Sequence, residues 1–415
     1  MSSCRVCSGP VYEFADFGRQ PLSGAFRLPD EHVEEFYFRL ALGMCETCKL
    51  VQLMEEVPRE RVFHEEHPYQ SSGSPVMRAH FEHAARRFLD VAGPGGFVVE
   101  LGCHDGVMLH LIADAGTRHL GVEPSEEVAS LAAGRGVRVR TDFFDAEVAD
   151  DIRAEDGPAD VIFASDTLCQ IPYVDSVLEG VSKLLAPRGM FLFEDPYFGD
   201  VLAQTSFDMI SLERSFYFTA RSVVSLAQRH DLELVDVQRV PVHGGEVQYT
   251  LMRPGARQPS PAVAELLAAE SAAWIADEPV LDAFGAGVDR IRNDLVALLT
   301  RLRDQGSTVA GYGATASCAM VTNYCGIGPD LVSYICDPTG ARKGRLSPGA
   351  RIPVHPRETF ASSYPDYALL FARNNATEVM AEESDFSRSG GRWIRYVPDV
   401  TVADVSDMDA VRAGT

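Results

Sequence analysis

The sequence of 415 residues lacks the marks of several large protein classes. It contains no run of about 18 apolar residues, which a membrane-spanning helix requires, and its start has no basic segment followed by an apolar stretch. Basic residues are scarce: 37 Lys and Arg stand against 60 Asp and Glu, a formal net charge of −23 that argues against nucleic acid as a partner. We therefore expect a cytoplasmic monomer that binds neither membranes nor nucleic acids.

The pattern along the chain predicts three parts. Residues 1–66 are rich in turns and carry two close pairs of cysteines. In residues 67–255 a helix is followed by alternating strands and helices, and residues 256–415 return to that alternation after a helical stretch. The expected fold class is α/β: a small N-terminal zinc-binding domain followed by two Rossmann-like domains, with ligands at the carboxyl ends of the strands.

The N-terminal cysteine pairs have the spacing of metal ligands. Cys4 with Cys7 and Cys45 with Cys48 form two CxxC pairs. Each pair can place two thiolates on one metal ion, and four thiolates make the closed tetrahedral site of structural zinc. Disulfides are not expected in a cytoplasmic chain. We predict one zinc ion that stabilises this domain without taking part in catalysis; the alternative is two unrelated CxxC pairs.

The first predicted strand of the middle domain, residues 97–102, runs into the glycine turn GCHDG at residues 102–106. This turn lacks the three-glycine pattern of dinucleotide-binding folds. Glu100 before it and Asp105 within it would repel a pyrophosphate, because both carry the same sign of charge as the phosphates. The same acids suit the sulfonium and ammonium groups of S-adenosylmethionine, which we predict as the cofactor.

Acidic residues also stand at the ends of the next two predicted strands. Glu123 is placed to accept both ribose hydroxyls, and Asp142 with Phe143 to bind and cover the adenine. Three strand ends in this order resemble the class I methyltransferases. The predicted cofactor-binding residues are Glu100, Gly102, Cys103, Asp105, Glu123, Pro124, Asp142, Phe143 and Asp166.

Eight short segments are distinctive when taken together: CRVC, CETCKLVQL, YQSSGS, ELGCHDG, TDFF, EDPYFGD, PVHGGE and GYGATA. With them the whole chain resembles the C-3 methyltransferases of TDP-deoxysugar biosynthesis, which build branched sugars of antibiotics. The resemblance implies that the sugar nucleotide lies between the two α/β domains. It also implies methylation at C-3 of a TDP-4-keto-deoxysugar: a base removes the hydrogen that the ketone acidifies, and the enolate carbon attacks the methyl group.

The same resemblance supplies candidate residues for the reaction. Tyr69, Glu213 and His243 match residues of the family's site. Gln170 and Arg214 stand where the family has histidines, and neither side chain can act as a base near neutral pH. Either catalysis has moved to the other residues, with Arg214 holding the enolate charge, or the substrate or reaction has changed. We expect Arg214 to pair with Glu213 or with that charge in a cleft between the α/β domains.

Other interpretations stay open. Tyr69 could be a core tyrosine, Glu213 an ion-paired carboxylate and His243 a residue that only holds its turn. The GYGATA turn at residues 311–316, or the main site, could admit NADPH, which would make the chain a ketoreductase of the 4-keto sugar, alone or together with methylation. A chain without its bases could also be a non-catalytic sugar-nucleotide binder.

Overall fold

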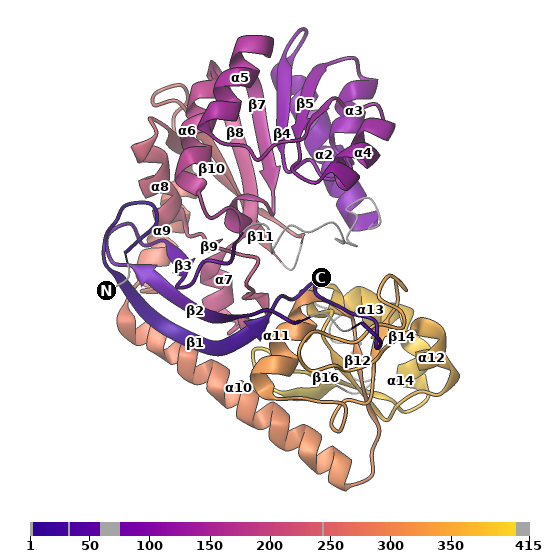
Figure 1. Cartoon of the computed structure of the whole chain (residues 1–415). Helices are drawn as coiled ribbons and strands as arrows, with labels where there is room; N and C mark the ends of the chain where they lie inside the picture. The colour runs from indigo at the N-terminus through magenta and orange to yellow at the C-terminus, as the bar shows by residue number, and fades with distance from the viewer. Residues whose placement is uncertain (1–2, 32–33, 59–74, 243–244, 404–415) are drawn as a thin grey trace.

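Three β-sheets organise the chain in the computed structural model, which describes residues 3–31, 34–58, 75–242 and 245–403 (Figure 1). The first sheet is antiparallel, in the order β1-β2-β3-β9. Its strands are β1 (Val11–Pro21), β2 (Tyr37–Cys45), β3 (Val51–Leu53) and β9 (Phe216–Tyr217). The N-terminal sheet thus takes its last strand from the middle of the chain.

The second sheet has seven strands in the order β10-β11-β8-β7-β4-β5-β6, and β11 alone runs antiparallel to its neighbours. Every residue of β4 is buried, because helices cover both faces of the sheet, and this explains its almost continuous apolar sequence. The strands are β4 (Phe97–Leu101), β5 (Arg118–Val122), β6 (Val139–Arg140), β7 (Ala159–Ser165), β8 (Leu185–Pro196), β10 (Glu233–Val240) and β11 (Glu246–Met252).

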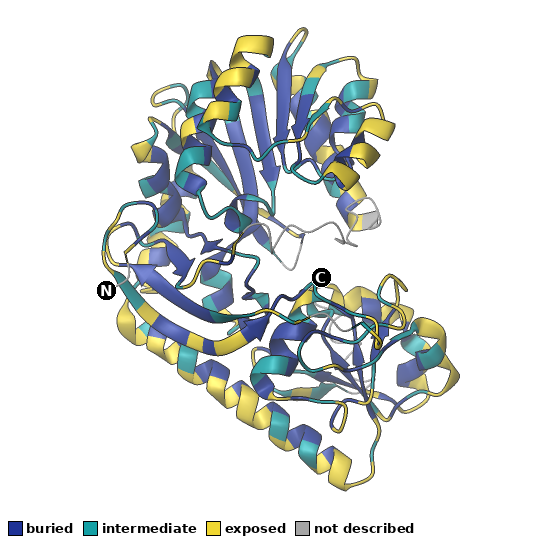
Figure 2. Ribbon diagram, in the orientation of Figure 1, coloured by how far each residue is buried: buried dark blue, intermediate teal, exposed yellow. Residues whose placement is uncertain are grey.

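Helices on the two faces of this sheet bury separate apolar clusters. The helices α2, α3 and α4 contribute to one cluster, and α5, α6 and α8 to the other. Their outward faces are exposed, whereas the strands between them are buried (Figure 2). The helices of this region are α2 (Pro75–Ala92), α3 (Leu109–Asp114), α4 (Glu126–Gly134), α5 (Ala146–Asp156), η2 (Leu168–Gln170), α6 (Val174–Leu184), α7 (Phe198–Ala203), η3 (Phe207–Met209) and α8 (Ala220–Arg229).

The third sheet follows α9 (Pro261–Ala272) and the long helix α10 (Glu278–Asp304). Its order is β14-β13-β12-β15-β16-β17, parallel except for the last pair. Its strands are β12 (Val309–Tyr312), β13 (Ile335–Asp337), β14 (Val354–Pro356), β15 (Tyr367–Leu370), β16 (Arg392–Arg395) and β17 (Thr401–Ala403). Its helices are α11 (Ala316–Cys325), α12 (Arg357–Ser362), η4 (Arg373–Asn375), α13 (Ala376–Glu382) and α14 (Ser384–Arg388).

Helix α10 joins the N-terminal sheet to the third sheet (Figure 1). Its buried residues recur every three or four positions and pack in one cluster with residues of both sheets. The expected α/β fold class, with two Rossmann-like sheets behind a cysteine-bearing domain, is confirmed. The domain limits after residues 66 and 255 stay predictions. Within the described ranges, no helix is both long and apolar enough to cross a membrane.

Candidate active site

The glycine turn after β4 is shaped by backbone conformations that favour glycine. Gly102 and Gly106 have φ angles of +66° and +73°. A Cβ atom on Gly102 would lie 2.7 Å from Oγ1 of Thr167, which follows β7. A larger residue would therefore strain the turn and collide with the side chain of Thr167. The turn thus lies at the carboxyl end of the central strands, where α/β sheets bind ligands.

Glu123 lies beside this turn and is held by backbone groups. Its carboxylate accepts N–H groups from His104 at 3.1 Å and from Ser125 at 3.0 Å. Burial raises the pKa of Glu123, and these two hydrogen bonds oppose that rise. Each oxygen accepts one of these bonds and keeps a lone pair, so the carboxylate can still accept the ribose hydroxyls of a bound cofactor.

The two other acids at the turn differ in their surroundings. Glu100 is buried, its Oε2 atom has no hydrogen-bond partner among the described residues, and burial together with neighbouring carboxylates raises its pKa well above the ordinary value. Asp105 is also buried, but Arg135 lies 3.4 Å from its Oδ2 atom. The charge of Asp105 is therefore partly offset within the protein, and Glu100 is the better fit to a bound ammonium group.

The remaining predicted cofactor residues are more varied. The thiol of Cys103 is buried against Gly121 of β5, where a Cβ would approach its sulfur to 2.4 Å. Asp142 is half-buried and forms an ion pair with Arg140. Pro124 and Phe143 are half-buried. Cys103 thus packs between the glycine turn and the sheet.

Asp166, directly after β7, contacts both Gln170 and Arg214, the residues that replace the two family histidines. Arg214 Nη2 lies 3.0 Å from each carboxylate oxygen of Asp166, and the side-chain amide of Gln170 donates to its backbone carbonyl at 2.5 Å. Burial by itself would lower the pKa of Arg214, but the Asp166 charge outweighs it and raises the pKa well above the ordinary value. The buried Asp195, after Glu194 in β8, lies in the same group of side chains. The structure thus brings Asp166, Gln170 and Arg214 together.

Glu213 points away from Arg214. Its Oε1 atom accepts both the backbone N–H and the hydroxyl of Ser23, each at 2.7 Å. Of the two partners expected for Arg214, Glu213 is wrong, because Asp166 binds the guanidinium and Ser23 binds the Glu213 carboxylate. Pairing of Arg214 with the enolate charge stays a prediction. Tyr69 and His243 lie outside the described residues.

A polar network at the same edge of the sheet was missed by sequence reasoning. The fully buried Glu194 of β8 lies 2.7 Å from Nε2 of His80 in α2, and it accepts the hydroxyl of Ser165 at 3.2 Å and the amide of Gln248 at 2.5 Å. Arg87 donates to the side-chain oxygen of Gln248 at 2.6 Å. EDPYFGD marks the family resemblance, but no local pattern shows that its glutamate meets a histidine 114 positions earlier in the chain.

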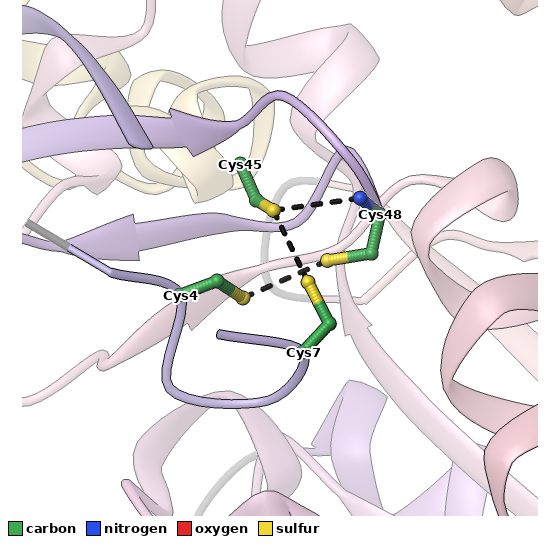
Figure 3. A group of neighbouring side chains, drawn as sticks. All are labelled: Cys4, Cys7, Cys45 and Cys48. Carbon is green, nitrogen blue, oxygen red and sulfur yellow. Dashed lines mark hydrogen bonds between the residues drawn. The ribbon is translucent and has the colours of Figure 1, made fainter. Parts of the chain in front are cut away.

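The four N-terminal cysteines converge as the CxxC spacing predicts (Figure 3). The sulfurs of Cys4 and Cys48 are 3.6 Å apart, those of Cys7 and Cys45 are 3.4 Å apart, and all four lie within 4.8 Å of one another. Tetrahedral zinc with Zn–S bonds of about 2.3 Å needs sulfurs about 3.8 Å apart, so these thiols fit that ion. The turns before β1 and after β2 position them.

Three domain families match successive parts of the chain. Residues 4–63 match a domain family described as zinc-binding, residues 77–237 match a methyltransferase domain family, and residues 241–398 match the C-methyltransferase C-terminal domain. The C-methyltransferase NovU of Streptomyces niveus is 34% identical over 414 residues, which span 97% of each chain. The chain belongs to the C-methyltransferase family. It is an S-adenosylmethionine-dependent C-methyltransferase, and these matches give the ketoreductase alternative no support.

Two solved structures align with part of this chain. Magnesium protoporphyrin IX methyltransferase of Synechocystis PCC 6803 aligns with a TM-score of 0.34 and 11% identity, over 47% of this chain and 89% of its own. The PH0226 protein of Pyrococcus horikoshii OT3 aligns with a TM-score of 0.36 and 20% identity, over 47% of this chain and 98% of its own.

We expect metal analysis of the purified enzyme to find about one zinc per chain, because four clustered thiolates form a closed zinc site. Cys48→Ser should lose most of that metal. Cys325→Ser, which changes a buried thiol of α11, is the matched control and should keep it. A Cys48→Ser enzyme with full metal content would contradict the assignment.

Glu123→Ala should weaken binding of S-adenosylhomocysteine about ten-fold or more, since hydrogen bonds to a charged group contribute about 1.5–3 kcal/mol. Titration calorimetry measures this directly. The exposed Glu127, in the first turn of α4, provides the control Glu127→Ala, for which we expect unchanged affinity. Unchanged affinity of the Glu123 variant would remove this residue from the cofactor pocket.

Proposed function

We propose that the enzyme methylates a carbon next to the ketone of a TDP-4-keto-deoxysugar, with C-3 as the favoured position, and that an enolate is the nucleophile. The observation that carries the proposal is the full-length match to a protein named as a C-methyltransferase. Carbon is a poor nucleophile unless it loses a proton, and a neighbouring ketone makes that loss feasible. The choice of a sugar nucleotide as the substrate rests on the resemblance to the TDP-sugar enzymes.

The residues present fit such a reaction. S-adenosylmethionine, when bound at the glycine turn, supplies an electrophilic methyl group. Glu100 and Glu123 would hold its ammonium and ribose, and we assign Asp142 and Phe143 to its adenine. Arg214, anchored on Asp166, would place a fixed positive charge near the oxygen that becomes negative in the enolate. The protein thus orients the cofactor and stabilises developing charge.

Product mass tests the proposal. Incubation with S-adenosylmethionine and candidate TDP-4-keto sugars should add one methylene unit to the sugar, and NMR of the product should locate the methyl group at C-3. A methyl group at C-5, which the same ketone acidifies, would keep the enolate chemistry and correct the position. A product heavier by two hydrogens, formed only with NADPH, would instead identify a ketoreductase, and no reaction with any such sugar would reject the substrate class.

A further inference from the structure

The replacement of two family histidines leaves the proton-abstraction step without an assigned base. Seven histidines lie in the described part of the chain. His83 is exposed, and His110 and His119 bond to nearby backbone carbonyls. His230 pairs with Asp175, and His355 packs on a tyrosine of the third sheet region. This leaves His80 and the glycine-turn His104 at the carboxyl edge of the second sheet.

We propose that His80, oriented by Glu194, is the general base that removes the proton next to the substrate ketone. This inference rests on the proposed function. The carboxylate of Glu194 accepts a hydrogen bond from the Nε2–H group of His80. This bond fixes the tautomer that carries its proton on Nε2 and a lone pair on Nδ1. Nδ1 makes no hydrogen bond with a described residue, and 13% of the His80 side chain is exposed. A buried carboxylate behind a partly accessible imidazole is a general-base arrangement.

The position of the pair agrees with this role. Glu194 stands opposite Ser165, the last residue of β7, and opposite Gln248 near the start of the antiparallel β11. These neighbours place the pair at the edge where α/β sheets bind ligands. The charge of Glu194 also contributes to the raised pKa of Glu100, so the pair lies close to the expected cofactor site.

The chemistry is a balanced proton transfer. Nδ1 of His80 takes the proton, the C–H electron pair forms the C=C bond of the enolate, and the carbonyl oxygen becomes negative. The enolate carbon then bonds to the methyl group while the methyl–sulfur bond breaks and its electrons stay on sulfur. His80 returns its proton to solvent, and no oxidant or reductant is needed.

Deuterium exchange separates the base from the methyl transfer. The enzyme with S-adenosylhomocysteine and a TDP-4-keto sugar in D2O should exchange the hydrogen next to the ketone, and NMR measures the rate. His80→Gln should slow this exchange and methylation by about 10²-fold or more, as expected for loss of a general base. The affinity for S-adenosylhomocysteine should not change. His83→Gln, one turn away and exposed, is the control and should behave like the wild type.

Further outcomes decide the inference. Imidazole added to His80→Ala should restore part of the exchange, a rescue that a purely structural histidine would not show. Wild-type rates in His80→Gln, or a parallel loss of S-adenosylhomocysteine binding in this variant, would overturn the role of His80 as the base. The proposed function would still stand if the wild-type enzyme methylates the sugar. A wild-type enzyme that neither exchanges nor methylates any such sugar would overturn both.

Discussion

Arg214→Ala should lower turnover by about 10²-fold, the effect of removing one oxyanion donor. The guanidinium of Arg214 lies at the end of β7. Both carboxylate oxygens of Asp166 accept hydrogen bonds from it and so fix its orientation. Because the charge acts on the enolate more than on the ketone, the loss should appear in kcat rather than in the affinity for S-adenosylhomocysteine. Steady-state kinetics and calorimetry on the same preparation measure the two effects.

Variants at the two unusual positions refine this result. Arg214→Lys keeps the charge but loses the planar donor geometry, so its turnover should fall between those of wild type and Arg214→Ala. Gln170→His with Arg214→His restores the family pattern and should preserve or raise methylation. Since both side chains contact Asp166, the effects of the two changes should not add. Arg214→Ala with the kcat of the wild type would refute the role assigned to Arg214, and a double variant that no longer methylates would show that the family's histidines cannot replace Gln170 and Arg214 in this enzyme.

Elements with a local signal were predictable from the sequence. Residues 97–102 were expected as a strand and form β4 over 97–101. The apolar run ADVIFASD likewise predicts a strand over residues 159–166, and β7 covers 159–165. The two apolar stretches within residues 232–252 also predict a hairpin, and they form the antiparallel pair β10 and β11. The cysteine site was also predictable, because each CxxC pair places two thiols together by itself. The hairpin of β1 and β2 then only has to join the two pairs.

Side-chain partners that depend on distant pairing could not be predicted. Arg214 meets Asp166 across 48 positions because β9, only two residues long, joins the N-terminal sheet and fixes the preceding segment. A strand of two residues has no periodicity to detect. The adjacent residue, Glu213, is thereby turned toward Ser23 of the N-terminal domain. The sequence identified both residues as candidates, but the partner of Glu213 lies in a separate domain and the partner of Arg214 lies 48 positions away in the chain.

Arg373→Ala should destabilise the third domain by about 3–5 kcal/mol, because it leaves a buried charge without its partner. Arg373 lies in η4 and binds Asp208 of η3 through two contacts of 3.1 Å, and Tyr396 donates to the same carboxylate at 2.8 Å. Burial by itself would lower the pKa of Arg373, but the Asp208 charge raises it above the ordinary value, so the ion pair persists. This buried pair connects the methyltransferase region to the third sheet.

Urea unfolding followed by tryptophan fluorescence should show the loss. The chain has two tryptophans, of which Trp393 is buried in β16 and Trp274 is exposed, so the signal reports mainly on the third domain. Adding Asp208→Asn to Arg373→Ala removes the unpaired charge and should recover part of the stability. Arg388→Ala breaks an exposed pair in the same domain and should leave the unfolding midpoint unchanged. If Arg373→Ala unfolds at the wild-type urea concentration, the buried pair does not stabilise the junction between the two domains.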